Sequence, residues 1–293
     1  MLDKVTKPLL PVTEFPWVKD PISPASKEEH AYTAGQHIAR TRVLLDDDEQ
    51  TEIINWGAGP GNRRSTLAVD KLKDRADVGP FGIFVAIEPD DLDLYRQILP
   101  VNFSMPARPV LSLVNLDYNQ PNEIVRYKEG MVMLKGVGAD GEEAWYVHSM
   151  PVETWLMLVM GHDWGFRKDL FDMTVTRQKT TVMQKNGDLY MSLELTDEHC
   201  PDGVDELVPQ AACGGTNNMA VIYPKNPDMM LRFGWSGKGI ALDDEKRMVR
   251  ITVNRTLEWA GLVPDGATAP GFFQRYTVDG GDSYIKKVRS TKN

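Results

Sequence analysis

The strongest constraint on the fold is a long succession of short apolar segments, separated by turn signals, that begins at Pro109. The stretches "GADGE" (138–142) and "KNGD" (185–188) predict hairpin turns, and the Asn-Gly pair of the second favours a type I′ turn. Closely spaced strands with few long helices predict a β-rich α+β fold: an antiparallel barrel or cone-like sheet with a few flanking helices, rather than a doubly wound parallel sheet. The predicted strands are "PVLSLVNLDY", "GMVMLKGV", "EEAWYVHSM", "TWLMLVMG", "LFDMTVTRQKTTVMQ", "DLYMSLELT", "MAVIYP", "MMLRFGWS" and "KRMVRITVNRTLEW".

The N-terminal part of the chain has a different character. We expect residues 1–75 to form an extension that packs on a strand-rich body made of residues 76–293. Residues 1–23 are rich in proline and predict an extended segment, whereas residues 23–45 predict a helix.

Three further segments of the body carry local signals. Residues 80–87 predict a strand, and residues 88–100 predict a helix with acidic residues in its first turn and one apolar face. The basic stretch "YIKKVRSTKN" at the end of the sequence predicts a frayed tail.

Composition and charge narrow the class of protein. The formal net charge of -9 argues against nucleic-acid binding, because phosphate contacts need clustered lysine and arginine. The apolar run Trp155–Met160 is far shorter than the ~20 residues of a membrane helix, and the N-terminus lacks a signal-peptide core. We therefore expect a cytoplasmic protein with no membrane or nucleic-acid partner. Cys200 and Cys213 are the only cysteines, and with His199 they make an incomplete zinc set, so isolated thiols are expected.

A glycine-rich turn offers one functional hypothesis. The stretch "EIINWGAGPGN" (52–62) runs from an apolar strand into "GAGPG", as in nucleotide- or S-adenosylmethionine-binding Rossmann domains. That fold needs alternating strands and helices afterwards, and a strand-rich body follows instead. A cofactor enzyme such as a methyltransferase remains an alternative.

Lys168 offers a second hypothesis. It lies in "GHDWGFRKDLFD" (161–172), after an apolar run and close to aromatic residues. An amine becomes a nucleophile near neutral pH when its pKa falls well below about 10.4, and burial lowers that pKa because it penalises the ammonium form. Arg167 would act in the same direction and Asp169 would oppose it, but neighbours in an extended segment point to opposite sides. Lys168 is therefore either a buried nucleophile or a solvated lysine.

Glu129 is the matching acid-base candidate. It lies in "VRYKEGMVML", between a polar turn and an apolar strand. Imine chemistry needs proton transfers to and from carbon and nitrogen, and a half-buried carboxyl group is suited to them. A plain strand-edge glutamate is the alternative.

These residues together resemble the acetoacetate decarboxylase-like superfamily. The stretch "YVHSMPVETWLMLVMGHDWGFRKDLFDMTV" is similar to the family's catalytic region, with His148 and Gly161 on the family's histidine and glycine, and Lys168 on its Schiff-base lysine. "RYKEG" places Glu129 on the family's active-site glutamate. "EPDDLDLYRQILP" and "NNMAVIYPKNPDMMLRF" resemble an early helix and a later strand pair, so the likeness spans roughly residues 80–255.

The chain also departs from the family pattern. Asp169 stands where the family has a second lysine, the cation that adjoins the nucleophile, so Arg167 or His162 would have to replace it. The family's arginine before the early helix has no match in "DVGPFGIFVAIEPD", which favours larger or non-classical carbonyl substrates.

The resemblance implies an active site and a reaction class. Lys168 and Glu129 would be catalytic, and the substrate would contact His148, Met150, His162, Phe166 and Arg167. The expected protein is a lyase, and a homo-oligomer, that acts on a keto acid or other small carbonyl compound through a lysine imine and enamine. Decarboxylation and aldol-type chemistry share that enamine, and neither a metal nor an organic cofactor is required. A family member that binds a small molecule without catalysis is the alternative, because Asp169 beside Lys168 could keep the lysine protonated.

Overall fold

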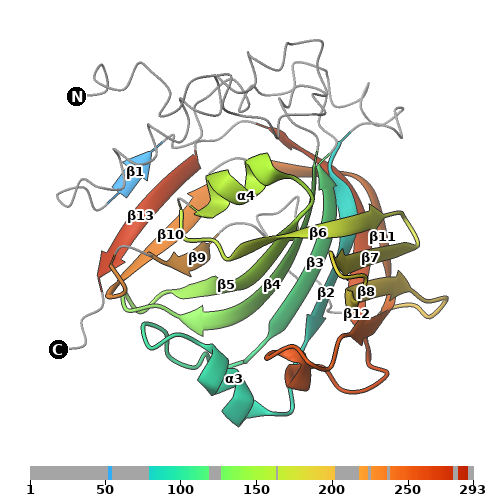
Figure 1. Cartoon of the computed structure of the whole chain (residues 1–293), viewed down its shortest axis with the longest axis horizontal. Helices are drawn as coiled ribbons and strands as arrows, with labels where there is room; N and C mark the ends of the chain where they lie inside the picture. Colours follow the sequence, from blue (N-terminus) through green and yellow to red (C-terminus); the bar gives the residue numbers. More distant parts are fainter. Residues whose placement is uncertain are drawn as a thin grey trace.

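A computed structural model describes most of the body of the chain as one large curved sheet with two short helices (Figure 1). The described residues are 52–54, 79–118, 127–162, 164–201, 218–223, 226–235, 238–279 and 283–289. The helix expected at 23–45, the "GAGPG" turn and Cys213 lie outside them.

The strands of the described part follow one another closely along the chain. They are β1 (Glu52–Ile54), β2 (Phe81–Ile87), β3 (Leu111–Tyr118), β4 (Tyr127–Val137), β5 (Glu143–Val152), β6 (Lys168–Val175), β7 (Lys179–Gln184), β8 (Leu189–Leu195), β9 (Met219–Ile222), β10 (Met229–Trp235), β11 (Lys238–Val253), β12 (Thr268–Asp279) and β13 (Ser283–Arg289). The helical elements are α3 (Leu92–Ile98), α4 (Trp155–His162) and a 3-10 turn η6 (Ala260–Leu262). The strand-rich class expected from the sequence is confirmed.

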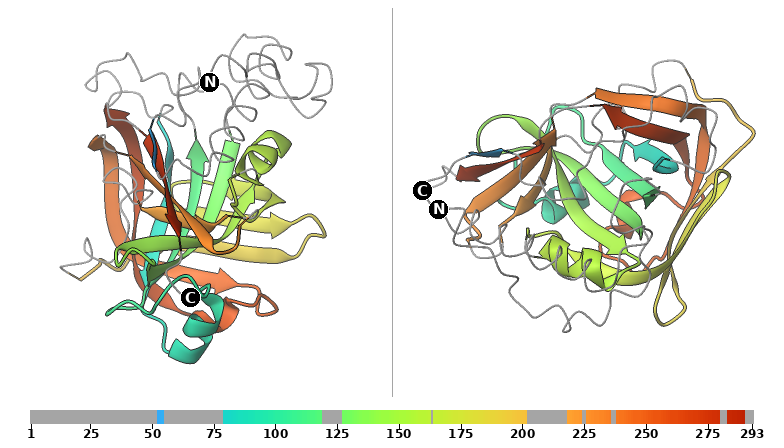
Figure 2. Two further views of the ribbon diagram at one scale, coloured as in Figure 1. Left: turned by 90° about the vertical axis from the view of Figure 1, so that its left-hand side faces the viewer. Right: turned by 90° about the horizontal axis from the view of Figure 1, so that it is seen from above.

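The sheet curls back on itself. Its strand order is β1-β13-β10-β9-β5-β4-β3-β2-β12-β11-β8-β7-β6, and the last strand, β6, also pairs with β5 near the middle. The pairings of β5 with β6 and with β9 are parallel, whereas the other pairings are antiparallel. The curvature is visible from the side and from above (Figure 2).

Two buried clusters lie on opposite faces of the central strands. Consecutive residues alternate between the clusters: Ile83 and Val85 belong to one, and Phe84 and Ala86 to the other. This is the period of two expected for strands that are covered on both sides. We call the cluster around Ile83 the first core and the cluster around Phe84 the second core.

Helix α3 forms where the acidic first turn predicts it. Asp91 caps its start, because the side-chain carboxylate accepts a hydrogen bond from the backbone N–H of Leu94 at 2.8 Å. Tyr95 anchors the helix to the sheet through hydrogen bonds from its hydroxyl to the carbonyl groups of Val110, at 2.9 Å, and Lys135, at 2.6 Å.

The prediction of a strand at "TWLMLVMG" is wrong, because Trp155–His162 form helix α4. Thr154 begins the helix: its hydroxyl oxygen accepts the backbone N–H of Met157 at 3.4 Å, and its carbonyl accepts that of Leu158 at 3.1 Å. A short apolar run has no periodicity that separates a buried strand from a buried helix. The cap is therefore the feature that identifies the helix.

Three other local predictions also need correction. The basic stretch at the end of the sequence is largely β13, which pairs with β1 and β10, and β12 was not predicted. In the hairpin at 185–188, Gly187 has a φ of +90° whereas Asn186 does not have a positive φ. A type I′ turn needs positive φ at both central residues. The bond from the Gly187 N–H to the Gln184 carbonyl instead closes a type I turn ahead of the glycine.

The strand before "GAGPG" does form, but not in a Rossmann arrangement. Residues 52–54 are β1, which pairs antiparallel with β13. A Rossmann domain would continue from this strand into a helix and a parallel neighbour.

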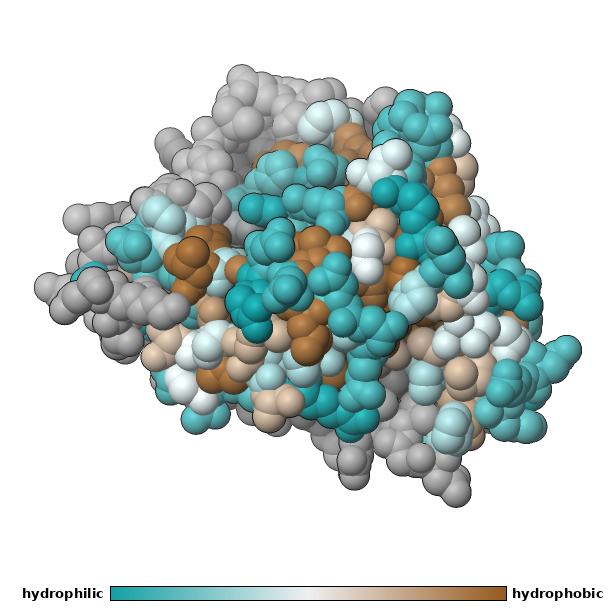
Figure 3. All heavy atoms as spheres, turned by 90° about the horizontal axis from the view of Figure 1, so that it is seen from below, coloured by the Kyte–Doolittle hydropathy of each residue, from teal (hydrophilic) through white to brown (hydrophobic). Residues whose placement is uncertain are grey.

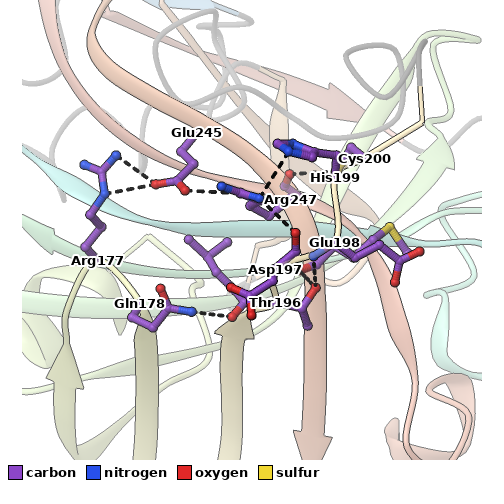
Figure 4. Close-up of polar contacts among 12 residues, drawn as sticks. Arg177, Gln178, Thr196, Asp197, Glu198, His199, Cys200, Glu245 and Arg247 are labelled. Carbon is purple, nitrogen blue, oxygen red and sulfur yellow. Dashed lines mark hydrogen bonds and ion pairs between the residues drawn. The ribbon is translucent and has the colours of Figure 1, made fainter.

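An exposed charged network fastens the β6–β7 turn to β11 (Figure 4). Arg177 of the turn donates to Glu245 at 3.0 Å, and Glu245 accepts a further bond from Arg247 at 3.2 Å. The hydrogen bond from Arg177 lowers the pKa of Glu245. A single exposed ion pair contributes little to stability, but several linked pairs contribute more. We therefore assign this network a role in stabilising the fold.

The surface has few exposed large hydrophobic residues. In the described part these are Leu92, Val101 and Trp155. Seen from below, hydrophobic side chains form small separate patches among hydrophilic ones (Figure 3). Among the described residues, no helix is long and apolar enough to span a membrane.

Candidate functional site

Lys168 is delivered to the site by the turn that ends helix α4. The N–H of Phe166 donates to the Gly161 carbonyl at 3.1 Å, the N–H of Gly165 donates to the His162 carbonyl at 3.0 Å, and Gly165 has a φ of +87°. This pair of bonds around a left-handed glycine is the Schellman motif, which stops a helix and redirects the chain. Strand β6 then begins at Lys168 itself.

The pairing of β6 with β5 decides which way each side chain points. Met150 pairs with Lys168 and Pro151 pairs with Asp169. Leu170 packs against the second core and Phe171 belongs to the first, so Lys168 points toward the second core and Asp169 toward the opposite face. Asp169 is exposed and Lys168 is 7% exposed. The acidic neighbour that the sequence places beside the lysine therefore faces away from it.

Glu129 is the partner of the Lys168 amine. Its strand, β4, pairs it with Leu116 of β3 and Val152 of β5, both fully buried. The distance between Lys168 Nζ and Glu129 Oε2 is 2.5 Å, and the two side chains are 8% and 6% exposed. The structure therefore brings together the two predicted catalytic residues, which lie 39 positions apart in the chain.

The surroundings of this pair are apolar and aromatic. Lys168 Nζ lies 5.8 Å from the centroid of the Phe166 ring. Phe233 of β10 contacts both Phe166 and Trp164, with ring centroids 4.8 and 5.9 Å apart. Met150, which was predicted to contact substrate, is 2% exposed in the same core. Hydrogen bonds and ion pairs are stronger where water is excluded, so this pair is suited to proton transfer.

His162 contacts Lys168 through the backbone. Its ring atom Nε2 lies 2.6 Å from the Lys168 carbonyl oxygen. The imidazole is exposed, and this bond ties the end of α4 to the start of β6. The structure therefore places His162 beside the Lys168 main chain.

His148 and Arg167 meet elsewhere, at Glu258. His148 Nε2 lies 2.9 Å from Glu258 Oε1, and Arg167 Nη1 lies 3.9 Å from the same oxygen. A register shift in the pairing of β4 with β5 leaves His148 as the extra residue of a β-bulge. The centroid of its ring lies 6.1 Å from that of Tyr146, which belongs to the first core. Burial lowers the pKa of His148, the Glu258 carboxylate raises it in part, and Arg167 lowers it further. The structure does not bring these two predicted contacts to the Lys168 amine.

Further buried polar groups adjoin the contact between His148 and Glu258. Tyr190 donates its hydroxyl to Ser149 at 2.8 Å and accepts the indole N–H of Trp259 at 3.3 Å. Burial raises the pKa of Tyr190, its hydrogen bonds with Ser149 and Trp259 lower it in part, and the charges of Asp169 and Glu258 raise it to a smaller extent. Asp169 thus acts on the first-core side of β6.

Sequence reasoning missed Glu258 and the role of Phe233. Glu258 follows β11 in an ordinary-looking "TLEW", and Phe233 sits in a strand that reads only as apolar. Both meet Lys168 or its neighbours through long-range contacts, for which a single sequence carries no local signal. Within the described ranges, no group of three or more histidine, cysteine, aspartate or glutamate side chains is arranged to hold a metal.

Comparison with solved structures shows that the chain has the acetoacetate decarboxylase-like fold. Acetoacetate decarboxylase from Legionella pneumophila aligns with a TM-score of 0.55 and 12% identity over 74% of this chain and 87% of that one. The enduracididine biosynthesis enzyme MppR, complexed with the condensation product of pyruvate and imidazole 4-carboxaldehyde, aligns with a TM-score of 0.52 and 12% identity over 73% and 89%. An acetoacetate decarboxylase-like enzyme from Sphingomonas wittichii aligns with a TM-score of 0.52 and 12% identity over 78% and 98%.

The comparisons by sequence give a different result. No protein-family model and no curated protein sequence matches the chain. The solved structures therefore confirm the resemblance at the level of the fold.

Proposed function

We propose that this chain is a carbon–carbon lyase that forms a Schiff base between Lys168 and a ketone or aldehyde. The observation that carries the proposal is the buried contact of 2.5 Å between Lys168 Nζ and Glu129 Oε2, among aromatic and aliphatic side chains. A primary amine next to a carboxyl group, away from water, is the minimal equipment for imine chemistry.

The first half of the proposed reaction makes the imine. Glu129 first takes a proton from the Lys168 ammonium, the lone pair of the neutral Nζ attacks the carbonyl carbon, and that proton passes from Glu129 to the carbonyl oxygen. The nitrogen of the resulting carbinolamine then loses a second proton to Glu129. Glu129 returns a proton to the carbinolamine oxygen, and the C–O bond breaks with loss of water. The product is a protonated imine, beside a Glu129 carboxylate.

The second half uses that imine as an electron sink. A bond to the neighbouring carbon breaks, its electron pair enters the iminium, and an enamine forms. When the broken bond leads to a carboxylate, the step is a decarboxylation; when it leads to a carbinol carbon, whose hydroxyl proton passes to Glu129, the step is a retro-aldol cleavage. Glu129 then protonates the enamine carbon, with the hydroxyl proton after a retro-aldol cleavage or with a proton taken up from solvent after a decarboxylation. Water hydrolyses the imine to release product and free Lys168.

The proteins that share the fold support this reaction class. One is named an acetoacetate decarboxylase, and another was solved with a condensation product of pyruvate and an aldehyde. The orientation of Asp169 also supports it, since that carboxylate does not compete with Glu129 for the amine.

The proposal is tested by trapping the imine. The protein is incubated with a panel of ketones, aldehydes and keto acids, reduced with borohydride, digested, and mapped by mass spectrometry. We expect the mass of a reduced adduct on the peptide that contains Lys168. Lys128, the neighbour of Glu129 that pairs with Glu153 at 2.8 Å, is the matched lysine: a Lys128→Ala variant keeps the adduct and a Lys168→Ala variant loses it.

The same contact also favours a second candidate function. A Lys168–Glu129 pair that stays intact could hold a carbonyl compound by hydrogen bonds without attacking it, which would make the chain a small-molecule binding protein. Binding of a carbonyl compound without any adduct after borohydride treatment would favour this alternative and contradict the lyase.

A further inference from the structure

Gly161, in the last turn of helix α4, lies directly against the side chain of Lys168. A β-carbon added at Gly161 would overlap the Cδ and Cε atoms of Lys168 and lie 3.0 Å from its Cγ. No other residue is among the three nearest neighbours of that position. The lysine stem therefore occupies the space that any other residue at position 161 would need.

Backbone conformation does not require this glycine. Gly161 is helical and is not among the glycines of positive φ in the described chain, so alanine would fit its backbone. Alanine is also the better helix former, by about 1 kcal/mol. The feature that distinguishes Gly161 is its contact with Lys168.

The turn that follows α4 explains how the contact arises. Gly161 is the residue whose carbonyl accepts the N–H of Phe166, in a motif where an apolar side chain usually packs against that position. Here the chain continues for two residues and returns Lys168 to the same place. The lysine stem replaces the usual apolar contact.

Lys168 has little room to move away. Its amine contacts Glu129 on one side, its strand pairs with Met150 on another, and the Phe166 ring lies beside it. An added methyl group at Gly161 would therefore displace the lysine stem, because its carbon would overlap the Cδ and Cε atoms of that stem.

We infer that Gly161 is a positioning residue for Lys168: the bare backbone of α4 holds the lysine stem so that its amine meets Glu129. The catalytic meaning of this inference rests on the proposed imine function, but the contact itself does not. Gly161→Ala then separates the amine from Glu129 while leaving both reacting groups in the chain.

The first test compares imine trapping and amine reactivity in Gly161→Ala and the wild type. We expect the rate of borohydride-trapped adduct formation to fall by about 10²-fold, as for a reacting group moved by about 1 Å. Acetic anhydride should modify Lys168 faster in the variant than in the wild type, because the displaced amine is less buried. Gly187→Ala is the control: it is the same change at an exposed hairpin with a φ of +90°, so it destabilises the protein without touching the lysine.

The second test is a double-mutant cycle on thermal stability, which requires no substrate. Gly161→Ala should lower the melting temperature in the wild-type background and should not lower it when Lys168 is also changed to alanine, because the overlapping Cδ and Cε atoms are then gone. An equal loss in both backgrounds would overturn the inference. A wild type that forms no adduct, together with a coupled cycle, would overturn the proposed function and leave the positioning contact standing.

Discussion

Two pairs of ionisable side chains lie on opposite sides of the seam between β5 and β6, and their environments differ. The Lys168–Glu129 pair is more than nine-tenths buried in the apolar second core, with its two charged atoms 2.5 Å apart. In the His148–Glu258 pair, the histidine is buried but the glutamate is 69% exposed. Only the first pair keeps both partners away from water, where a proton can pass between them without competition from solvent.

The difference between the two regions arises from strand alternation. Arg167 and Asp169 flank Lys168 in the sequence, yet Arg167 approaches Glu258 and the Asp169 charge acts on Tyr190. Within β6, the side chain of the residue after Lys168 points to the other face, and Arg167 comes just before the strand begins. The charges of Arg167 and Asp169, which would affect the Lys168 amine, therefore lie in the second region, that of the His148–Glu258 pair.

The largest expected effect comes from exchanging the two carboxylates for amides. Glu129→Gln removes the proton acceptor beside the amine, and we expect the rate of imine formation to fall by about 10²–10⁴-fold. Glu258→Gln should change that rate by less than about threefold, because its carboxylate lies near His148 and Arg167 instead. Single-turnover trapping of both variants measures the difference, and equal rates would remove the functional distinction between the regions.

The two pairs should also differ in how much they contribute to the free energy of unfolding. Glu129→Ala leaves a buried ammonium without its partner, at a cost of about 3–5 kcal/mol in the free energy of unfolding. Glu258→Ala removes an exposed partner and should cost less than about 1 kcal/mol. Urea denaturation of each variant provides the comparison. A double variant, Lys168→Met with Glu129→Leu, should be as stable as the wild type or more so, since apolar residues can replace a buried pair; strong destabilisation of that variant would contradict the apolar setting described above.

The smallest expected effect is a pH dependence that arises from His148. Burial lowers the pKa of His148 below 6.5, so the unfolded chain binds a proton more readily than the folded one. The stability from neutral His148 is complete above pH 6.5 and is lost as the pH falls through the folded value, at up to about 1.4 kcal/mol per pH unit.

A His148→Gln variant isolates this contribution, because glutamine can still donate to Glu258. Between pH 7 and pH 5, we expect the variant to lose less stability than the wild type in urea denaturation. Parallel curves for the two proteins would show that His148 titrates alike in the folded and unfolded states. Glu258, Arg167 and Tyr146 face this histidine and are unchanged in the comparison.

Much of the fold could be predicted because its signals are local. Short apolar runs bounded by turn signals predict strands such as β2, β5 and β8, and the acidic first turn predicts α3. Helix α4 could not be separated from a strand, because a short apolar run lacks periodicity. Strand β13 was missed because its partners, β1 and β10, lie far away in the chain and its basic composition resembles a tail.

The site could be predicted only in part, because most of its contacts join distant parts of the chain. Lys168 and Glu129 could be paired only through resemblance to known proteins, because no local pattern links residues 39 positions apart. The direction of Asp169 followed from alternation once β6 was known to begin at Lys168. Glu258 and the close approach of Gly161 depend on tertiary packing, which no local sequence signal records.

Exchange of a ketone's carbonyl oxygen with ¹⁸O-labelled water tests the central claim most directly. Each cycle of imine formation and hydrolysis replaces that oxygen with one from solvent, whether or not a carbon–carbon bond breaks afterwards. For at least one ketone of a small aliphatic and aromatic panel, mass spectrometry should show faster exchange with the wild type and with Glu258→Gln than in buffer, and the buffer rate with Lys168→Ala. Exchange by Lys168→Ala at the wild-type rate, or no acceleration of any ketone by the wild type, would contradict the assignment of Lys168 as the nucleophile.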